Sequence, residues 1–246
     1  MLSLCFLFFG CNRDWGNPTS RNYPINGNYA KLEICGAFEV EVSDQVSDVV
    51  VTVGDLAHEK VLVKVTDGWL HIGFEPNTNY TGVAKAIIPA SILYELKLSG
   101  ASSLTGDLDG ENVKIGLSGA SIYRGNVSAN IVHFDLSGAS TFNGEIDAYK
   151  IFMNLSGASI ATTNGTCHTL MEINLSGASR LNAANLDAPM VQGIMSGGSF
   201  ADVTCCSSLN VELSGGSTLV YGIVSDGCLP VINCPSSGGS IVKPRS

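Results

Sequence analysis

Apolar and polar residues alternate with a period of two before each copy of a repeated five-residue motif. Apolar side chains stand four and two residues ahead of the motif, and mostly polar side chains stand between and after them. The first apolar column contains Tyr94, Val113, Val132, Ile151, Met171, Val191, Leu209 and Ile232, and the second contains Leu96, Ile115, Phe134, Met153, Ile173, Gly193, Val211 and Cys234. This alternation is typical of a β-strand with one buried face, so each repeat predicts such a strand.

The motif itself recurs eight times. It is LSGAS at Leu98, Leu117, Leu136, Leu155 and Leu175, and it returns as MSGGS at Met195, LSGGS at Leu213 and SSGGS at Ser236. Most copies are 19 or 20 residues apart, a period typical of one solenoid coil. A further apolar column follows six residues after each motif begins and predicts a second strand, so the motif lies at a corner where glycine permits a sharp turn. We expect the motif alanine to fill a crowded inner bend. We expect the serine hydroxyls to satisfy backbone groups of the corner and to bond to the serine one coil above.

These patterns predict an all-β fold, a single-stranded right-handed parallel β-helix with about 19–20 residues per coil. Residues 31–97 lack the motif but keep the alternation in short segments separated by turns. They predict N-terminal coils or a cap, because an open solenoid end would expose strand edges and apolar side chains. The motif coils then fill residues 98–246, so residues 31–246 form one body.

The first residues indicate a targeting signal rather than a part of the folded body. Residues 1–10 are apolar and end in glycine before Cys11, and the run is shorter than the roughly 20 residues that span a bilayer. It is typical of the end of a bacterial lipoprotein signal, so residues 1–11 predict a signal peptide whose Cys11 becomes the lipid attachment site. A buried or disordered apolar end is the alternative. Residues 12–30 are rich in Asn, Gly and Pro and predict a flexible tether.

Charge argues against two classes of partner. The chain has 13 basic and 22 acidic residues, a net charge of −9, and therefore has no electrostatic footprint for nucleic acid or anionic lipid. We expect contact with a membrane only through the lipid anchor. Hydrophobic residues make up 45% of the chain and charged residues 14%, which excludes a disordered chain.

Apart from Cys5 and Cys11, six cysteines remain, and an even number in an exported chain permits disulfides. Cys205 and Cys228 each stand eight residues before a motif, so in ideal register they stack on adjacent coils within disulfide reach. We therefore predict a Cys205–Cys228 bond, with Cys206–Cys234 as an alternative or additional pair. Cys167 is expected to be a small buried core residue. A zinc cluster is disfavoured because the chain has no CxxC pair.

The sequence offers little for catalysis, and we predict no catalytic residue, metal or cofactor. The motif serines, which the repeat stacks from coil to coil, have no regularly placed general base beside them. They are therefore interpreted as structural. His133 and Asp135 share the outward face of one strand and would supply half of a metal or acid–base site, but they have no evident third partner. Three carboxylates near residue 109 would suit Ca²⁺, although a solvated acidic loop is the favoured interpretation; they are Asp107, Asp109 and Glu111.

Two outward columns of neighbouring coils form the best candidate for a binding surface. Amides, a carboxylate and an exposed aromatic ring suit contacts with sugar or protein, while an ordinary sheet exterior is the competing interpretation. The candidate residues are Phe152, Asn154, Glu172, Asn174, Gln192 and Ile194.

Several segments together resemble a known family. The order of GAFEVEV at Gly36–Val42, DGWLHI at Asp67–Ile72, the LSGAS coils, STLVYG at Ser217–Gly222 and the final SSGGS is similar to the bacterial head domain of putative autotransporter-type adhesins, the GIN domain. The resemblance covers roughly residues 31–243. It implies a right-handed β-helix, an exported or lipid-anchored protein of Bacteroidetes-type bacteria, and no established catalytic residues.

The leading hypothesis is a non-enzymatic binding or adhesion module of the cell envelope, carried as an outer-membrane lipoprotein, either periplasmic or surface-exposed. Its outer face would recognise a glycan or a protein. Two alternatives stay open: a β-helix enzyme that acts on polysaccharide, and a structural or envelope-stress scaffold with no small ligand.

Overall fold

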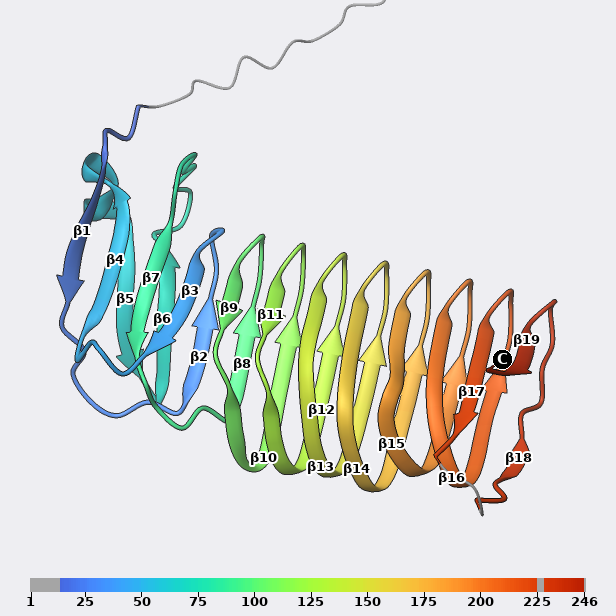
Figure 1. Ribbon diagram of the computed structural model, residues 1–246. Coiled ribbons are helices and arrows are strands. Elements are labelled where there is room, and N and C mark those ends of the chain that lie inside the picture. The colour runs from blue at the N-terminus through green and yellow to red at the C-terminus, as the bar shows by residue number, and fades with distance from the viewer. Residues whose placement is uncertain (1–13, 225–227, 246) are drawn as a thin grey trace, which may run out of the picture.

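The chain forms a β-solenoid of about eight turns with roughly 19 residues per turn, so the predicted fold class is confirmed (Figure 1). The computed structural model describes residues 14–224 and 228–245. The predicted signal peptide, residues 1–11, and its lipid attachment site, Cys11, lie outside these residues. The described helix is the short 3-10 helix η1 (Asp55–Lys60), and no helix in this part of the chain is long and apolar enough to cross a membrane.

Each regular coil has a strand before the corner motif and a strand after it. Between the third and the seventh motif copies the two merge, so that one strand runs from corner to corner. In the motif coils the strands pair in parallel with their equivalents in the neighbouring coils. The motif coils contain β8 (Glu95–Leu98), β9 (Ser103–Thr105), β10 (Leu108–Leu117), β11 (Ile122–Arg124), β12 (Val127–Leu136), β13 (Thr141–Leu155), β14 (Ile160–Leu175), β15 (Arg180–Met195), β16 (Phe200–Leu213), β17 (Thr218–Ile223), β18 (Val231–Asn233) and β19 (Ile241–Pro244).

The core is a stack of equivalent side chains from successive coils. The leading residue of each motif from Leu98 to Leu213 is at most 2% exposed. Larger rings fill the wider part of the interior, where Phe142 lies 4.5 Å from Phe134 and 5.5 Å from Tyr123 between ring centroids. Burial of one such apolar side chain contributes about 1.5–3 kcal/mol, so the repeated column is a continuous source of stability.

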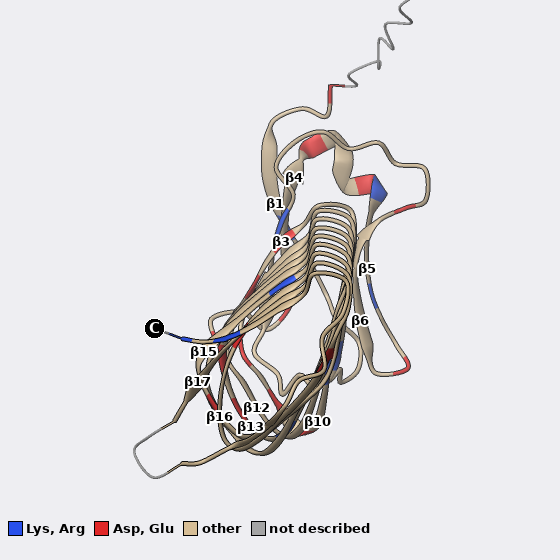
Figure 2. Cartoon of the chain, turned by 90° about the vertical axis from the view of Figure 1, so that its right-hand side faces the viewer, with Lys and Arg blue, Asp and Glu red and all other residues tan. Residues whose placement is uncertain are grey.

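The corners superpose closely along the solenoid axis (Figure 2). In the motif at Leu155, Gly157 has φ +67°, and the following Ala158 donates its backbone N–H to the Gly138 carbonyl of the previous coil at 2.7 Å. A Cβ atom on Gly157 would lie 2.7 Å from that same carbonyl oxygen. Glycine is therefore required both by the left-handed backbone and by the close approach of the next coil.

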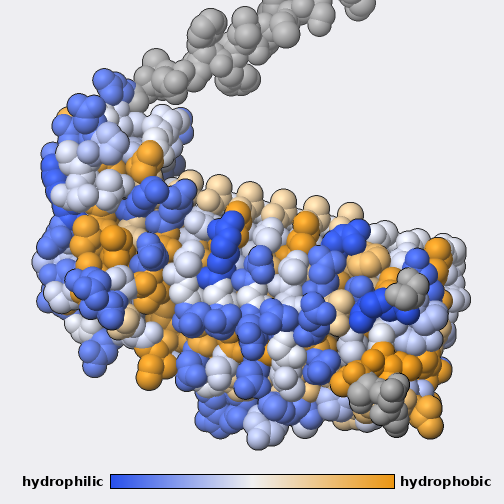
Figure 3. Space-filling view, viewed as in Figure 1, coloured by the Kyte–Doolittle hydropathy of each residue, from blue (hydrophilic) through white to orange (hydrophobic). Residues whose placement is uncertain are grey.

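Two details of the corner differ from the sequence-based expectation. The motif alanines, such as Ala139 and Ala158, are exposed rather than inside the bend, and they form a row of small side chains along the ridge of corners (Figure 3). The buried serine at the end of the motif bonds to backbone carbonyls, as expected, but not to another serine hydroxyl, and the Ser199 hydroxyl has no hydrogen-bond partner among the described residues. Ser140 donates to the Leu117 carbonyl of the previous coil at 3.4 Å, and Ser159 donates to Ser156 of its own corner at 2.8 Å. A strand-end carbonyl thus supplies the acceptor that the buried hydroxyl needs.

The first two coils do not stack in sequence order. β2 (Lys31–Ile34) lies between β6 (Trp69–Phe74) and β8, and β3 (Glu39–Ser43) lies between β7 (Lys85–Pro89) and β9, all in parallel. Residues 34–38, ICGAF, stack under the first LSGAS corner, since Ser99 donates to the Ile34 carbonyl at 3.0 Å. They are a degenerate copy of the motif, with Ile34 aligned to Leu98, and they keep only its Gly-Ala pair.

Antiparallel strands cover the N-terminal coils. β4 (Val49–Gly54) pairs with β7 and with β1 (Pro18–Tyr23), and β5 (Val61–Thr66) pairs with β6. The predicted tether over residues 12–30 is therefore wrong for its described part. Trp15 and Tyr29 are buried, and the Tyr29 hydroxyl donates to the Pro89 carbonyl at 2.7 Å. Trp15 and Tyr29 are isolated aromatic residues in an otherwise polar segment, and their side chains make the core contacts of that segment.

The disulfide joins Cys206 and Cys228, so the predicted Cys205–Cys228 bond is wrong. Adjacent residues of a strand point to opposite faces, and in β16 it is Cys205 that faces the core, where it is fully buried. Cys206 faces outward and meets the segment that leaves the coil after β17. Cys234, the alternative partner, is a half-buried free thiol, and Cys167 is buried at 1% exposure, as expected.

A buried histidine holds β1 against η1. His58 is 4% exposed; its Nδ1 lies 2.9 Å from the Tyr23 hydroxyl and its Nε2 lies 3.0 Å from the Thr19 carbonyl. Burial lowers the pKa of His58, and the charge of Arg21 acts in the same direction, against the Thr19 carbonyl and Asp55. The neutral imidazole is therefore the form that the folded protein favours.

We expect Gly157→Ala to lower the free energy of unfolding by about 1–3 kcal/mol or more, because alanine would adopt the left-handed backbone and contact the Gly138 carbonyl. Urea unfolding followed by circular dichroism measures this change. The matched control is Ala158→Ser on the exposed ridge, which should change stability by no more than about 0.5 kcal/mol. Equal effects of the two substitutions would contradict this account of the corner.

We also expect His58 to make the protein less stable in acid. The unfolded chain takes up a proton at this position below pH about 6.5, whereas the folded chain resists protonation until lower pH, so stability falls as the pH decreases through that range. His58→Gln should flatten the decrease in Tm between neutral and mildly acidic buffer, and His168→Gln, a surface control, should retain it. If Tm of His58→Gln falls as steeply as that of the parent, another group sets the dependence.

Candidate functional site

The six predicted binding residues lie together on one flat surface of the solenoid. This surface consists of the outward side chains of the strands that precede the corners, and we call it the ladder face. The backbone register aligns Phe152 with Glu172 and Gln192 in one column, and aligns Asn154 with Asn174 and Ile194 in the next. The coil before them extends the columns with His133 and Asp135.

Hydrogen bonds connect the polar members from coil to coil. Asn154 Nδ2 donates to Asp135 Oδ1 at 2.8 Å, and Asn174 Nδ2 donates to Asn154 Oδ1 at 3.1 Å. In the neighbouring column, Gln192 Nε2 donates to Glu172 Oε2 at 3.1 Å. These bonds hold the planar groups in place and leave further donor and acceptor positions for a ligand. The ladder face therefore presents fixed polar groups at the spacing of the strands, about 4.8 Å.

Apolar side chains adjoin this polar ladder. The rings of His133 and Phe152 stack with centroids 4.6 Å apart and an interplanar angle of 6°. Ile194, which follows Asn174 in the second column, is 54% exposed. The arrangement combines oriented hydrogen-bonding groups with a flat ring, and both are features that bind polyhydroxylated ligands.

Two shallow hollows lie within the ladder face. One, of about 230 Å³, is lined by Asp135, Ser137, Asn154, Ser156 and Asn174 among others. The second, of about 380 Å³, extends the predicted set toward the C-terminal coils and includes Glu172, Gln192, Ile194, Asn210 and Glu212. Asn210 and Glu212 occupy the same two columns as the predicted residues, so the repeat itself contained the signal that would have found them.

At the N-terminal end the ladder face becomes aromatic and basic. Lys97 Nζ lies 4.3 Å from the centroid of the Trp69 ring, and Lys31 Nζ lies 5.5 Å from it. His71 Nδ1 and Glu33 Oε2 are 2.6 Å apart. Sequence reasoning missed this cluster because the residues meet only through the exchanged stacking order of β2, β6 and β8.

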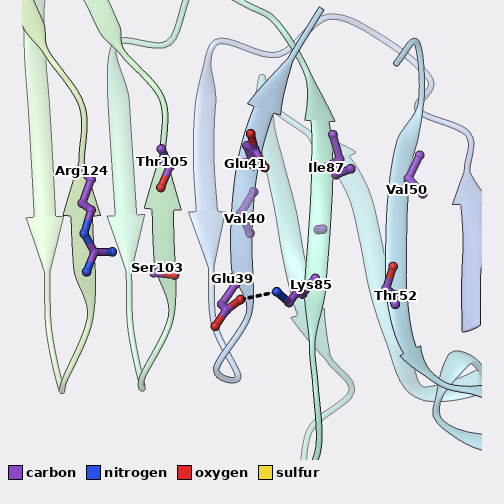
Figure 4. Close-up of a pocket in the computed structure, with 11 residues that line it drawn as sticks. Glu39, Val40, Glu41, Val50, Thr52, Lys85, Ile87, Ser103, Thr105 and Arg124 are labelled. Carbon is purple, nitrogen blue, oxygen red and sulfur yellow. Dashed lines mark ion pairs between the residues drawn. The ribbon is translucent and has the colours of Figure 1, made fainter. Parts of the chain in front are cut away.

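A separate groove lies on the second outward surface, across the strands that follow the corners (Figure 4). It has a volume of about 420 Å³ and crosses β11, β9, β3, β7 and β4. Glu39 and Lys85 form an ion pair of 3.0 Å within it. No sequence pattern indicated this groove, because its strands come from segments that are distant in the chain.

The residues considered above for a metal or acid–base site do not form one cluster, and several of them contact other groups. His133 stacks on Phe152, and Asp135 accepts the hydrogen bond from Asn154. Asp107 Oδ1 accepts the Asn126 backbone N–H at 2.7 Å. Within residues 14–224 and 228–245, no group of three or more His, Cys, Asp or Glu side chains is arranged to hold a metal ion.

Solved structures share this fold across nearly the whole chain. A "putative lipid binding protein" of Parabacteroides distasonis matches with a TM-score of 0.81 and 18% identity, and a "putative adhesin" of the same organism matches with 0.78 and 21%. A "putative adhesin" of Parabacteroides merdae matches with 0.79 and 17%. Each match covers 94% of this chain and 98% of the other. At these identities the matches show the fold.

The comparison with curated proteins found no match. The comparison with family models did: residues 28–222 match the model described as "Putative auto-transporter adhesin, head GIN domain". This range contains the exchanged N-terminal coils, the ladder face and seven of the eight motif copies, and it confirms the family resemblance of the sequence. The chain therefore belongs to the head GIN domain family of putative auto-transporter adhesins.

Proposed function

We propose that this protein is a non-enzymatic adhesion module of the cell envelope that binds a glycan chain along the ladder face. Membership in an adhesin family supports a role in binding an external ligand rather than in turnover. The observation that carries the glycan assignment is the in-register ladder of amides and carboxylates, in which Asn174 bonds to Asn154 and Gln192 bonds to Glu172.

Three properties of the ladder face fit a glycan. Carboxylate and amide groups form paired hydrogen bonds with neighbouring hydroxyls, and here they are held in fixed orientations before the ligand arrives. Phe152, which stacks on His133 and is partly exposed, adds apolar surface for the C–H groups of a sugar ring. The two hollows are adjacent along the ladder face, since Asn174 lines both, so a polymer that follows the ladder would cross several coils and repeat the same contacts.

The proposal places the module at the outer membrane. Export is supported by the auto-transporter adhesin family, and the apolar run before Cys11 supports lipid attachment at that residue. In this arrangement Cys11 anchors the chain to the membrane and the folded coils carry the ladder face. Labelling of cells with a radioactive fatty acid tests the anchor: the protein should be labelled, and Cys11→Ala should remain unlabelled and leave the membrane fraction.

We expect the chain without its first 11 residues to bind selectively and saturably on an array of mucin and bacterial envelope glycans. Asn174→Ala should weaken that binding about 5- to 30-fold, because it removes the central amide and its bonds to Asn154 and Glu172. Phe152→Ala should weaken it similarly.

The matched control is Asn182→Ala, which removes an amide bonded from coil to coil, to Thr162, on the second surface. It should bind normally. Hydrolysis of a bound glycan would favour the polysaccharide-acting enzyme. Absence of glycan binding together with a stoichiometric protein partner would favour a protein ligand or a scaffold role.

A further inference from the structure

The groove of Figure 4 contains two opposite charges that the fold leaves unpaired. The Arg124 guanidinium and the Glu41 carboxylate have no side-chain hydrogen bond or ion-pair partner among the described residues. The adjacent Glu39 and Lys85, in contrast, neutralise each other at 3.0 Å. Figure 4 shows Arg124 at one end of the groove and Glu41 near its middle. We propose that this groove binds a short zwitterionic peptide, with its carboxylate at Arg124 and its ammonium group at Glu41.

The backbone positions of the two charged residues limit the length of the ligand. Glu41, Thr105 and Arg124 are aligned in register on β3, β9 and β11, so the two charged residues stand two strand spacings apart, about 9–10 Å. An extended peptide advances about 3.3–3.6 Å per residue, so the termini of a di- or tripeptide span a comparable distance. A single amino acid is too short to reach both charges.

The groove between the charges has hydrogen-bonding groups for a peptide backbone. Ser103 and Thr105 project small hydroxyl side chains between Glu41 and Arg124, and their lack of bulk forms the hollow (Figure 4). Neither hydroxyl has a hydrogen-bond partner among the described residues, so each is available to a peptide N–H or carbonyl. Beyond Glu41, Ile87 and Val50 form an apolar end for a side chain.

Charge also selects against other ligands. A polyanion such as a phosphorylated glycan would meet Arg124 but would be repelled by Glu41. A neutral sugar would leave both charges desolvated without a counterion, which is unfavourable. A zwitterion satisfies both groups, and the volume of about 420 Å³ is in the range of small-ligand sites. This assignment is independent of the ladder face, which lies on the other side of the coil.

Calorimetry with trialanine tests the proposal, with N-acetyl-trialanine and trialanine amide as ligands that each lack one terminal charge. We expect saturable binding of trialanine and a loss of at least about tenfold in affinity for either capped form. Glu41→Gln should lose the preference for the free amine, and Arg124→Met should lose the preference for the free carboxylate. The specific loss of one preference separates direct recognition from a general effect on folding.

Arg180→Met is the matched control, because Arg180 lies on the same surface, stacks on Phe200 with its guanidinium carbon 4.1 Å from the ring centroid, and lies outside the groove. This variant should bind trialanine as the parent does. The proposal is overturned if trialanine does not bind at millimolar concentration, or if the capped peptides bind equally well. It is also overturned if Glu41→Gln and Arg124→Met, at unchanged Tm, keep both preferences.

Discussion

The backbone contact between successive corners is the constraint on which the structure depends. At each regular corner a glycine in the left-handed conformation brings the chain close to the glycine of the previous coil, and the residue after it donates a hydrogen bond to that glycine's carbonyl at 2.7–2.8 Å. This contact fixes both the spacing and the register of the coils. Equivalent residues are therefore stacked directly above one another, inside and outside the sheet.

Stacking of equivalent residues has different consequences on the two sides of the sheet. Inside, it joins apolar columns into one continuous core, and the hydroxyl of a buried serine such as Ser140 donates to a carbonyl of the preceding coil. Outside, it aligns polar side chains into ladders such as Asp135–Asn154–Asn174, and core packing does not restrict which side chains stand there. The fold therefore fixes the geometry of its outer surfaces while it leaves their chemistry free to vary.

The N-terminal region departs from this regularity, and the departures create distinct surface features. Insertion of β2 and β3 between β6, β7 and the motif coils brings Trp69, Lys31 and Lys97 together on the ladder face. The same exchange builds the groove on the second surface from β3, β7 and β9. Antiparallel strands β1, β4 and β5 then cover the coils, and His58 holds β1 in place through Thr19 and Tyr23.

The sequence by itself determined the solenoid, its period, its corner glycines, its core columns and the six aligned residues of the ladder face, because each is a local property repeated at constant spacing. Only the tertiary structure decided the stacking order of the first coils, the ordered β1 within the expected tether, the outward alanines and the choice of Cys206 over Cys205. These features depend on contacts between segments without a shared repeat, or on which side of one strand faces the core. A shift of one residue reverses the side that faces the core. The last two motifs are separated by a longer segment than the others, so the repeat did not fix the register of Cys228 against Cys205 and Cys206.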